Sequence, residues 1–209
     1  MTPEAIAHLS RADKTLGRLI KKVGPCRLAP ATRRTPFQAL VRSVTFQQLN
    51  GKAAETILGR VLALYPGKTF PIPEDVLATP DETLRAAGLS RNKTAAVKDI
   101  AAKTLAGIVP DSRTIRKLSN EAILERLTSV RGVGPWTVEM LLMFTLGRED
   151  VLPATDFGVR KGFALTYGLT EMPSPEAVLA HGEKWRPHRT TASWYLWRAV
   201  DLASNDATG

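Results

Sequence analysis

The sequence of 209 residues contains a single cysteine, Cys26, and only three histidines. One thiol excludes an intramolecular disulfide, a four-cysteine iron–sulfur cluster and a zinc site built from thiolates. The histidines His8, His181 and His188 are too few and too scattered for a histidine-based catalytic metal centre. The sequence therefore gives no sign of a metal centre or cluster built on these residues.

The sequence also lacks a long apolar run, although 44% of its residues are hydrophobic. No stretch has the length of a membrane span, and residues 1–19 lack the apolar core of a signal peptide. We therefore expect a soluble protein of the cytoplasm or nucleoid, with no membrane partner. Its length suffices for one sizeable core or two small lobes.

Acidic residues are outnumbered by basic ones, 20 to 29, which gives a net charge of +9 and a pI near 10.0. Surplus surface lysine is one explanation of this balance. A polyanionic partner is the other, because neutralising phosphates releases counterions and supplies affinity that does not depend on sequence. Charge alone does not distinguish DNA from RNA or anionic lipid.

Strand patterns are weak, and apolar residues recur at helical spacing along most of the chain. The sequence is therefore predicted to be all-α, with short polar connectors. Ser90 and Ser119 are expected to cap helices. Residues 1–35 are poor in apolar side chains and contain proline, so they cannot form a core alone. We expect them to dock on the C-terminal helices.

The most informative segment is Leu127-Thr-Ser-Val-Arg-Gly-Val-Gly-Pro-Trp136, where a Gly-Val-Gly turn separates two helical patterns. Such a turn is more often an ordinary helix C-cap. Here the glycines also allow the close approach of a phosphate, and the start of the second helix supplies N–H donors and a positive dipole end. We predict a helix-hairpin-helix over residues 119–147 that binds the DNA backbone through Gly132, Gly134 and Thr137. Backbone carbonyls near the turn could hold a monovalent cation: Thr128, Val130 and Val133.

A lone carboxylate follows the hairpin in Leu152-Pro-Ala-Thr-Asp156, at the start of the next helical pattern. Thr155 is the expected N-cap, and the helix dipole favours an ionised acid in the first turn. A helix-start residue is the usual explanation of such an aspartate in isolation. Beside a DNA-binding hairpin, such a carboxylate could do chemistry on the bound strand. The pairing suggests an enzyme that works on a nucleotide in DNA, with Asp156 as its candidate chemical group.

Five segments in order resemble the helix-hairpin-helix DNA glycosylase superfamily, and within it the 3-methyladenine DNA glycosylase II family. They cover about residues 37–200 and read Ser43-Val-Thr-Phe-Gln-Gln-Leu49 with Lys52-Ala-Ala54, Gly88-Leu-Ser-Arg-Asn-Lys93, the hairpin with Trp136, Leu152-Pro-Ala-Thr-Asp156, and Trp185-Arg-Pro-His-Arg189. The resemblance implies an all-α fold of two helical lobes with an active-site cleft between the lobes. One glycosylase domain, 1–209, would consist of lobe 36–150 and of lobe 1–35 plus 151–209.

The implied activity is that of a monofunctional DNA glycosylase in base excision repair. It would flip an alkylated base, such as 3-methyladenine or a related cationic purine, out of double-stranded DNA and hydrolyse its N-glycosidic bond. Asp156 matches the family's catalytic aspartate. Trp136 stands where lyase-type relatives carry a nucleophilic lysine, so no Schiff base is expected. Alkylation already makes the base a good leaving group, so no catalytic cofactor is required, and we expect a monomer.

The resemblance also implies a base pocket, lined by Trp136, Met140, Phe46 and His188. An electron-rich indole face would attract a cationic base, although core packing against the hairpin is the alternative explanation of Trp136. At the position of His188 relatives often carry an aromatic residue, and at that of Met140 some carry tyrosine. Both differences affect the predicted pocket wall and therefore the substrate range.

Further DNA contacts are implied for Gln48, Leu49, Arg160 and Lys161. Gln48 lies where relatives place the side chain that fills the gap left by the flipped base, and a buried helix-capping glutamine is the competing explanation. Arg160 and Lys161 follow Asp156 and would contact phosphates, although a solvated charge pair would look the same.

Two other functions fit parts of the sequence. A non-enzymatic helix-hairpin-helix module would bind DNA, but it would not need the Leu152–Asp156 segment. A glycosylase for oxidised or mismatched bases is the second alternative. Lyase-type enzymes for oxidised bases usually need the lysine that Trp136 replaces, and many mismatch relatives carry a cysteine cluster that this sequence lacks.

Overall fold

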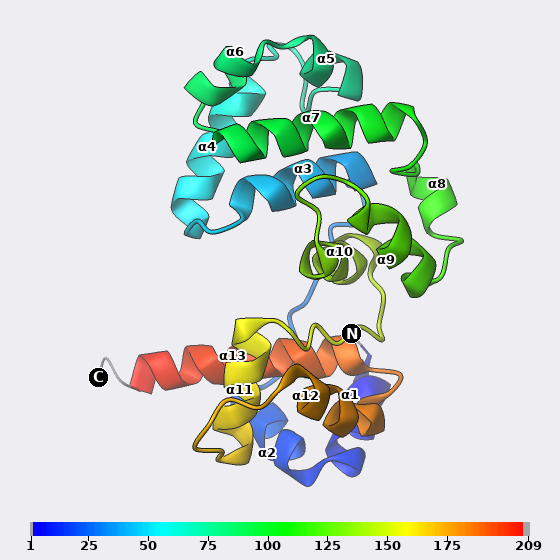
Figure 1. Ribbon diagram of the computed structural model, residues 1–209. Coiled ribbons are helices and arrows are strands. Elements are labelled where there is room, and N and C mark those ends of the chain that lie inside the picture. The colour runs from blue at the N-terminus through cyan, green and yellow to red at the C-terminus, as the bar shows by residue number, and fades with distance from the viewer. Residues whose placement is uncertain (1, 207–209) are drawn as a thin grey trace. The chain divides into compact units, whose positions relative to one another are not determined.

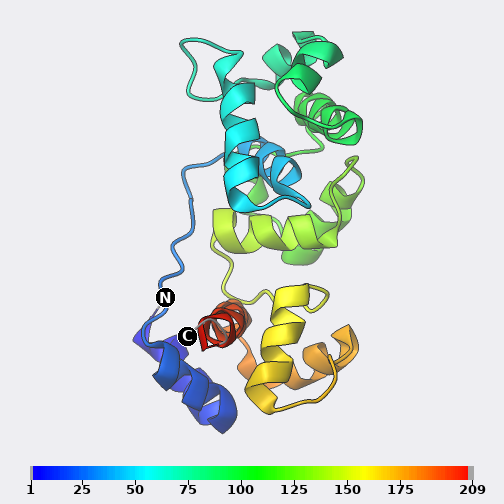
Figure 2. The same cartoon turned by 90° about the vertical axis from the view of Figure 1, so that its left-hand side faces the viewer.

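The computed structural model describes residues 2–206, and every regular element within that range is helical (Figures 1 and 2). The all-α class predicted from helical periodicity is confirmed. Contacts divide the chain into two compact units, Met1–Pro30 with Gly147–Gly209 and Ala31–Leu146. The lobes expected from the sequence had boundaries a few residues further along, at 35/36 and 150/151.

The unit Ala31–Leu146 is built around α7, which packs against α3, α5 and α6. A second contact group joins α10 to α3 and α9. Its elements are α3 (Pro36–Phe46), α4 (Gly51–Ala63), α5 (Pro73–Ala78), α6 (Asp81–Ala86), α7 (Arg91–Leu105), α8 (Ser112–Ile115), α9 (Asn120–Thr128), α10 (Pro135–Leu141) and a π-helical turn, η1 (Leu142–Leu146). Its core side chains include Leu40, Val44, Leu58, Leu84, Val97, Ile100, Ile123, Leu127, Val138 and Leu141.

Helix starts in this unit follow local sequence signals. Ser90 and Ser119 cap α7 and α9 as predicted, because their side-chain oxygens accept the N–H groups of Lys93 and Ala122. One local feature was not predicted from the sequence. The helix that begins at Pro135 keeps α geometry only to Leu141 and then continues as η1, where wider turns change which side chains face inward.

The other unit consists of α1 (Pro3–Ala12), α2 (Lys14–Val23), α11 (Phe157–Tyr167), α12 (Pro175–Gly182), a 3₁₀ turn η2 (Glu183–Trp185) and α13 (Arg189–Asp206). The helices α11 and α13 cross at close range (Figure 1). Gly162 permits this crossing, since a Cβ there would lie 1.9 Å from the carbonyl oxygen of Leu196.

The N-terminal segment supplies two helices that the sequence analysis did not predict. Leu9, Leu16 and Ile20 are buried in one core cluster with residues of α11, α12 and α13. The expected docking on the C-terminal helices is therefore confirmed for α1 and α2. Each helix carries only a narrow apolar stripe, so residues 1–35 contain few apolar side chains. These few side chains are buried because the stripes face the C-terminal helices.

Candidate active site and DNA-binding hairpin

Asp156 lies at the N-terminus of α11 and is itself the N-cap of that helix. Its Oδ1 accepts the N–H of Val159 at 2.8 Å. The prediction that Thr155 would be the cap is wrong, because the carboxylate of Asp156 makes the capping hydrogen bond. Asp156 is partly exposed.

A tryptophan that the sequence analysis did not single out orients this carboxylate. Nε1 of Trp197, on α13, donates to Oδ1 of Asp156 at 2.8 Å. Gly158 allows the indole to approach, since a Cβ there would lie 2.7 Å from Cδ1 of Trp197. The two partners are 41 residues apart, and no local pattern connects them. One sequence feature could have pointed to Trp197. It lies outside the apolar stripe of the last helix, and its indole N–H needs an acceptor.

The Gly132-Val-Gly134 turn has a backbone geometry that requires glycine, and it packs closely on α7. Gly132 has a φ of 75°, and a Cβ there would lie 2.7 Å from Cβ of Ala96 on α7, so a larger residue would strain the turn. The N–H of Arg131 donates to Oδ2 of Asp99, also on α7, at 2.8 Å. Gly134 is the N-cap of α10, and Pro135 occupies its first turn. The turn therefore rests on α7.

The segment between α3 and α4, Gln47–Asn50, lies against this turn; we call it the wedge loop. Nε2 of Gln47 donates to the carbonyl oxygen of Gly132 at 3.0 Å and to Oγ1 of Thr137 at 3.2 Å. Thr137 is only 2% exposed, so its hydroxyl supports the loop from inside. The burial contradicts the predicted DNA contact for the side chain of Thr137. Gln48 is exposed, and Leu49 is 39% exposed. The structure thus brings together two segments from which DNA contacts were expected.

Three of the predicted pocket residues belong to the unit Ala31–Leu146. Trp136 is 38% exposed, more than core packing alone would leave. Met140, one helical turn later on α10, is partly buried. Phe46 closes α3 and carries the guanidinium of Arg42 over its ring, 4.2 Å from the centroid. The three are aromatic and thioether side chains, the types expected to pack against a base, and their role in a base pocket stays a prediction.

His188 belongs to the other unit and lies just before α13. Its ring meets that of His8 edge-on, with centroids 5.4 Å apart, and its Nδ1 is 3.9 Å from a carboxylate oxygen of Glu149. The preceding motif builds the turn into α13. Trp185 is fully buried, and both arginines of the motif, Arg186 and Arg189, pair with Asp150.

The two predicted phosphate contacts on α11 differ in their surroundings. Nε of Arg160 donates to the carbonyl oxygen of Pro173 at 2.8 Å, which ties α11 to the segment before α12. Lys161 is exposed. Exposure of Lys161 fits a phosphate contact and a solvated charge equally well, so the predicted contact stays a prediction.

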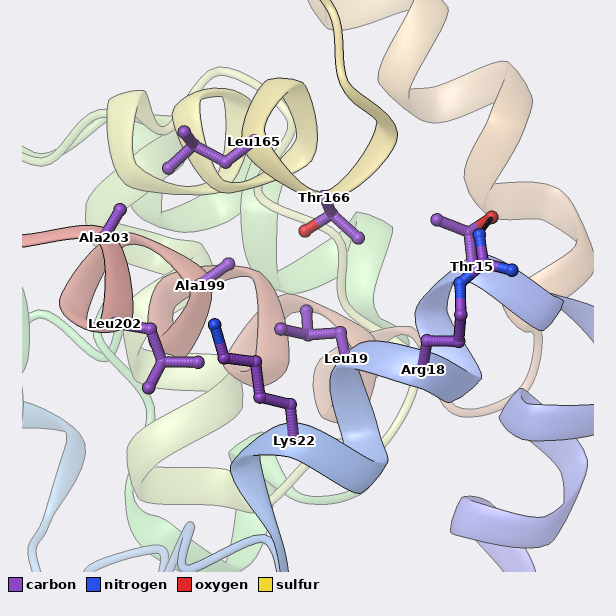
Figure 3. Close-up of a pocket in the computed structure, with 9 residues that line it drawn as sticks. All are labelled: Thr15, Arg18, Leu19, Lys22, Leu165, Thr166, Ala199, Leu202 and Ala203. Atoms are coloured by element: carbon purple, nitrogen blue, oxygen red, sulfur yellow. Dashed lines mark hydrogen bonds between the residues drawn. The ribbon is translucent and has the colours of Figure 1, made fainter. Parts of the chain in front are cut away.

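The residues expected to hold a cation line one surface hollow at the hairpin: Thr128, Val130 and Val133, together with Asp99 and Lys103. A second hollow, of about 320 Å³, lies between α2, α11 and α13 (Figure 3). Its wall includes Leu19, Leu165 and Leu202, and Lys22 reaches from α2 toward α13. No residue predicted to act in catalysis or DNA binding lines this second hollow.

An all-helical chain with a glycine hairpin and an aspartate held at a helix start has the features of a helix-hairpin-helix DNA repair protein. Residues 41–188 match the family described as HhH-GPD superfamily base excision DNA repair protein. That match spans more than half of the sequence, and the chain belongs to this family.

Individual relatives agree with the family assignment. The chain is 41% identical over 201 residues to DNA-3-methyladenine glycosylase 1 of Schizosaccharomyces pombe, covering 96% of this chain and 88% of the relative. The structure of 3-methyladenine DNA glycosylase Mag1 from the same yeast, in complex with abasic DNA, superposes with a TM-score of 0.89 over 96% of this chain and 98% of that one. DNA-3-methyladenine glycosidase from Bacillus halodurans superposes with a TM-score of 0.85 at 36% identity, over 97% and 92% of the two chains.

Proposed function

We propose that this chain is a monofunctional DNA glycosylase that removes alkylated bases, 3-methyladenine and related cationic purines, in base excision repair. The observation that carries the proposal is Asp156, a partly exposed carboxylate fixed at the start of α11 by a backbone N–H and by the indole of Trp197. Family membership and the two yeast comparisons supply the reaction class.

The reaction needs an anion near the sugar. As the base departs, the sugar gains positive charge, and a fixed carboxylate stabilises that charge more in the transition state than in the ground state. Asp156 would provide this anion and orient a water toward C1′. Two hydrogen bonds on the same oxygen, Oδ1, hold the carboxylate in one orientation, which reduces reorganisation during the reaction. The family's reaction requires no cofactor.

DNA binding is assigned to the hairpin and the wedge loop. The N–H groups of Arg131 and Val133 bond within the protein, so we assign phosphate contact to Gly132 in the turn and to Gly134, the N-cap of α10. Gln48 would enter the space left by the flipped nucleotide. Trp136 would face the base, where an indole attracts a cationic purine by about 0.5–2 kcal/mol. Trp136 has no amine, so no covalent enzyme–DNA intermediate forms through its side chain.

Two finer features belong to the same proposal. Carbonyl oxygens of Thr128, Val130 and Val133 would hold a monovalent cation, and these residues do line one hollow beside the carboxylate of Asp99. Carbonyl oxygens are hard donors that suit such an ion, but two cationic side chains, Lys103 and Arg131, line the same hollow as Asp99. A bound ion would contribute positive charge at the DNA backbone. The enzyme would act as a monomer on nucleoid DNA. No helix within residues 2–206 is both long and apolar enough to cross a membrane.

Chromatography of the bases released from a panel of methylated duplexes tests the proposal, with enzyme-free incubations as the control for spontaneous depurination. We expect free 3-methyladenine and no adduct trapped by borohydride. Binding without release would identify a DNA-binding module instead. Release accompanied by a trapped adduct would reject the monofunctional mechanism, and release restricted to oxidised or mismatched bases would reject the substrate class.

A further inference from the structure

Gln48 has a backbone conformation that its position in the loop alone does not explain. With a φ of 56°, it is the one residue other than glycine that has a positive φ within the described part of the chain. The left-handed region is unfavourable for an L residue with a long side chain. Residues held there against this preference are stabilised by their surroundings, and they are frequent at functional sites.

The neighbouring backbone of Gln48 is held by a lysine from a distant helix. Nζ of Lys93, on α7, donates to the carbonyl oxygen of Thr45 at 2.8 Å and to that of Gln47 at 2.7 Å. Partial burial lowers the pKa of Lys93. The ammonium group also lies at the C-terminal end of α3, where the helix dipole favours a cation.

The Gly88–Lys93 segment is arranged to present this lysine. Gly88 has a φ of 113° and makes the turn that precedes α7. Ser90 caps α7 by accepting the N–H of Lys93, so the backbone of Lys93 is fixed at the same place where its side chain leaves the helix. This motif has no part in the proposed chemistry of Asp156, and the structure assigns it a different task.

The same face of α7 supports the hairpin. Lys93, Ala96 and Asp99 follow at intervals of three residues, which places them on one side of a helix. Ala96 lies under Gly132, and Asp99 accepts the N–H of Arg131. Gln47 then joins the wedge loop to the hairpin through its bond to the carbonyl oxygen of Gly132. One helix therefore fixes both the turn assigned to phosphate binding and the loop assigned to the gap in the duplex.

We propose that Lys93, acting with Gln47, is a positioning residue that holds Gln48 in the conformation needed to enter the gap left by the flipped nucleotide. This inference rests on the proposed function, because it requires an enzyme that flips a base. Lys93 does not act on the substrate. It fixes the two carbonyl groups before the wedge residue, so that Gln48 reaches the duplex without first being ordered.

A double-mutant cycle tests this role. Lys93→Met removes the ammonium group and keeps an unbranched stem, and Gln48→Ala removes the wedge. The dissociation constants of each variant and of the double variant are measured for an abasic-site duplex and for an intact duplex of the same sequence. The readout is the preference for abasic DNA, which general weakening of the fold leaves unchanged. Lys98→Met, on the same helix and paired with Asp81, is the control for loss of one positive charge.

We expect Lys93→Met and Gln48→Ala each to reduce the preference for abasic DNA by about tenfold. Lys93→Met loses the two charge-assisted hydrogen bonds that hold the loop, and Gln48→Ala loses the side chain that would enter the gap. The double variant should lose no more than either single variant, because both changes remove the same contact. Lys98→Met should keep the wild-type preference. Additive losses in the double variant, or a wild-type preference in Lys93→Met, would overturn the proposal.

A folding defect in Lys93→Met would not end the test. Gln47→Met removes the amide that joins the loop to the hairpin, and the proposal requires the same non-additive behaviour with Gln48→Ala. The wild-type protein separates this inference from the proposed function. If it releases no base from methylated DNA, the proposed function fails. If it releases base while the cycles are additive, only the role of Lys93 and Gln47 fails.

Discussion

Two aspartates in the unit Met1–Pro30 with Gly147–Gly209 start from the same local arrangement. Asp13 caps α2 and Asp156 caps α11, each by accepting a backbone N–H group within the first helical turn. Each carboxylate also accepts an indole N–H from a tryptophan later in the chain. Trp185 donates to Asp13 at 3.1 Å, and Trp197 donates to Asp156 at 2.8 Å. Helix capping and an indole partner therefore do not distinguish a structural carboxylate from a catalytic one.

The surroundings do distinguish them. Asp13 is 4% exposed, and its Oδ2 also accepts from the hydroxyl of Tyr167 at 2.6 Å, with Nε2 of His181 at 3.0 Å and Nζ of Lys184 at 3.1 Å. Burial alone would raise the pKa of Asp13, but hydrogen bonds from Tyr167, the backbone N–H of Leu16, Trp185 and His181 outweigh it and hold the pKa below its usual range. Asp156 remains partly exposed. A carboxylate enclosed by donors stabilises the fold, whereas one that is oriented and accessible can act on a substrate.

The largest expected effect is on the chemistry of Asp156. Asp156→Asn keeps the shape of the side chain and removes its charge, so single-turnover excision of 3-methyladenine should fall by about 10²–10³. Thermal stability and affinity for abasic DNA should change little. Asp201→Asn, on the exposed side of α13, has the same change in charge and should excise at the wild-type rate. Near-wild-type excision by Asp156→Asn would falsify the proposed mechanism.

Asp13→Asn should show the opposite pattern. An amide nitrogen would face the donors of Tyr167, Trp185 and Lys184, and breaking a buried charge network of this kind costs about 3–5 kcal/mol. For a chain of this size, the melting temperature should fall by roughly 10 °C or more. Excision per folded molecule, measured well below the melting temperature, should stay near wild type. A stable Asp13→Asn variant with low excision would mean that the roles of the two aspartates are not separate.

Sequence patterns predicted the elements whose signals are local. Helical periodicity and the serines at positions 90 and 119 located α7 and α9, and the glycine turn located the hairpin. Asp156 and Gln48 were expected from the resemblance, which depends on the order of motifs. The structure places both in fitting surroundings, and their roles stay predictions.

The contacts that the sequence did not reveal join residues far apart in the chain. Asp13 and Trp185 are 172 residues apart, Asp156 and Trp197 are 41 apart, and Lys93 is 46 residues from Gln47. Each of these side chains also has a common local explanation, as a cap, a core aromatic or a surface lysine. A single sequence gives no physical reason to prefer the long-range partner over the local explanation.

Trp197→Phe tests how much the orientation of Asp156 matters. The change removes the indole N–H that donates to Oδ1 and keeps an aromatic ring beside Gly158. We expect excision to fall by about tenfold, as for the loss of one hydrogen bond to a charged group, with unchanged binding to abasic DNA. Trp194→Phe, one turn earlier on α13 and stacked with Arg198, is the matched control. Equal rates in both variants would show that the indole does not orient the carboxylate.

The smallest effect concerns the acid stability that Asp13 confers. Because its pKa is lower in the folded state than the value of about 3.9 in an unfolded chain, its stabilisation is complete above about pH 4. It is lost progressively as the pH falls below that value toward the folded pKa, where the carboxylate binds a proton. Urea unfolding of the wild type at a series of acidic pH values should therefore show a falling free energy of unfolding.

Asp13→Asn should flatten that dependence, because the group that binds the proton is gone. Asp111→Asn is the control, since Asp111 caps α8 at the surface and hydrogen bonds from Thr114 and Arg113 lower its pKa as well. An exposed carboxylate is screened by solvent, so its replacement should change the pH dependence less than replacement of Asp13. If Asp13→Asn kept the wild-type slope below about pH 4, the enclosed carboxylate would not be the group whose protonation weakens the fold, and the contrast with Asp156 would rest on accessibility alone.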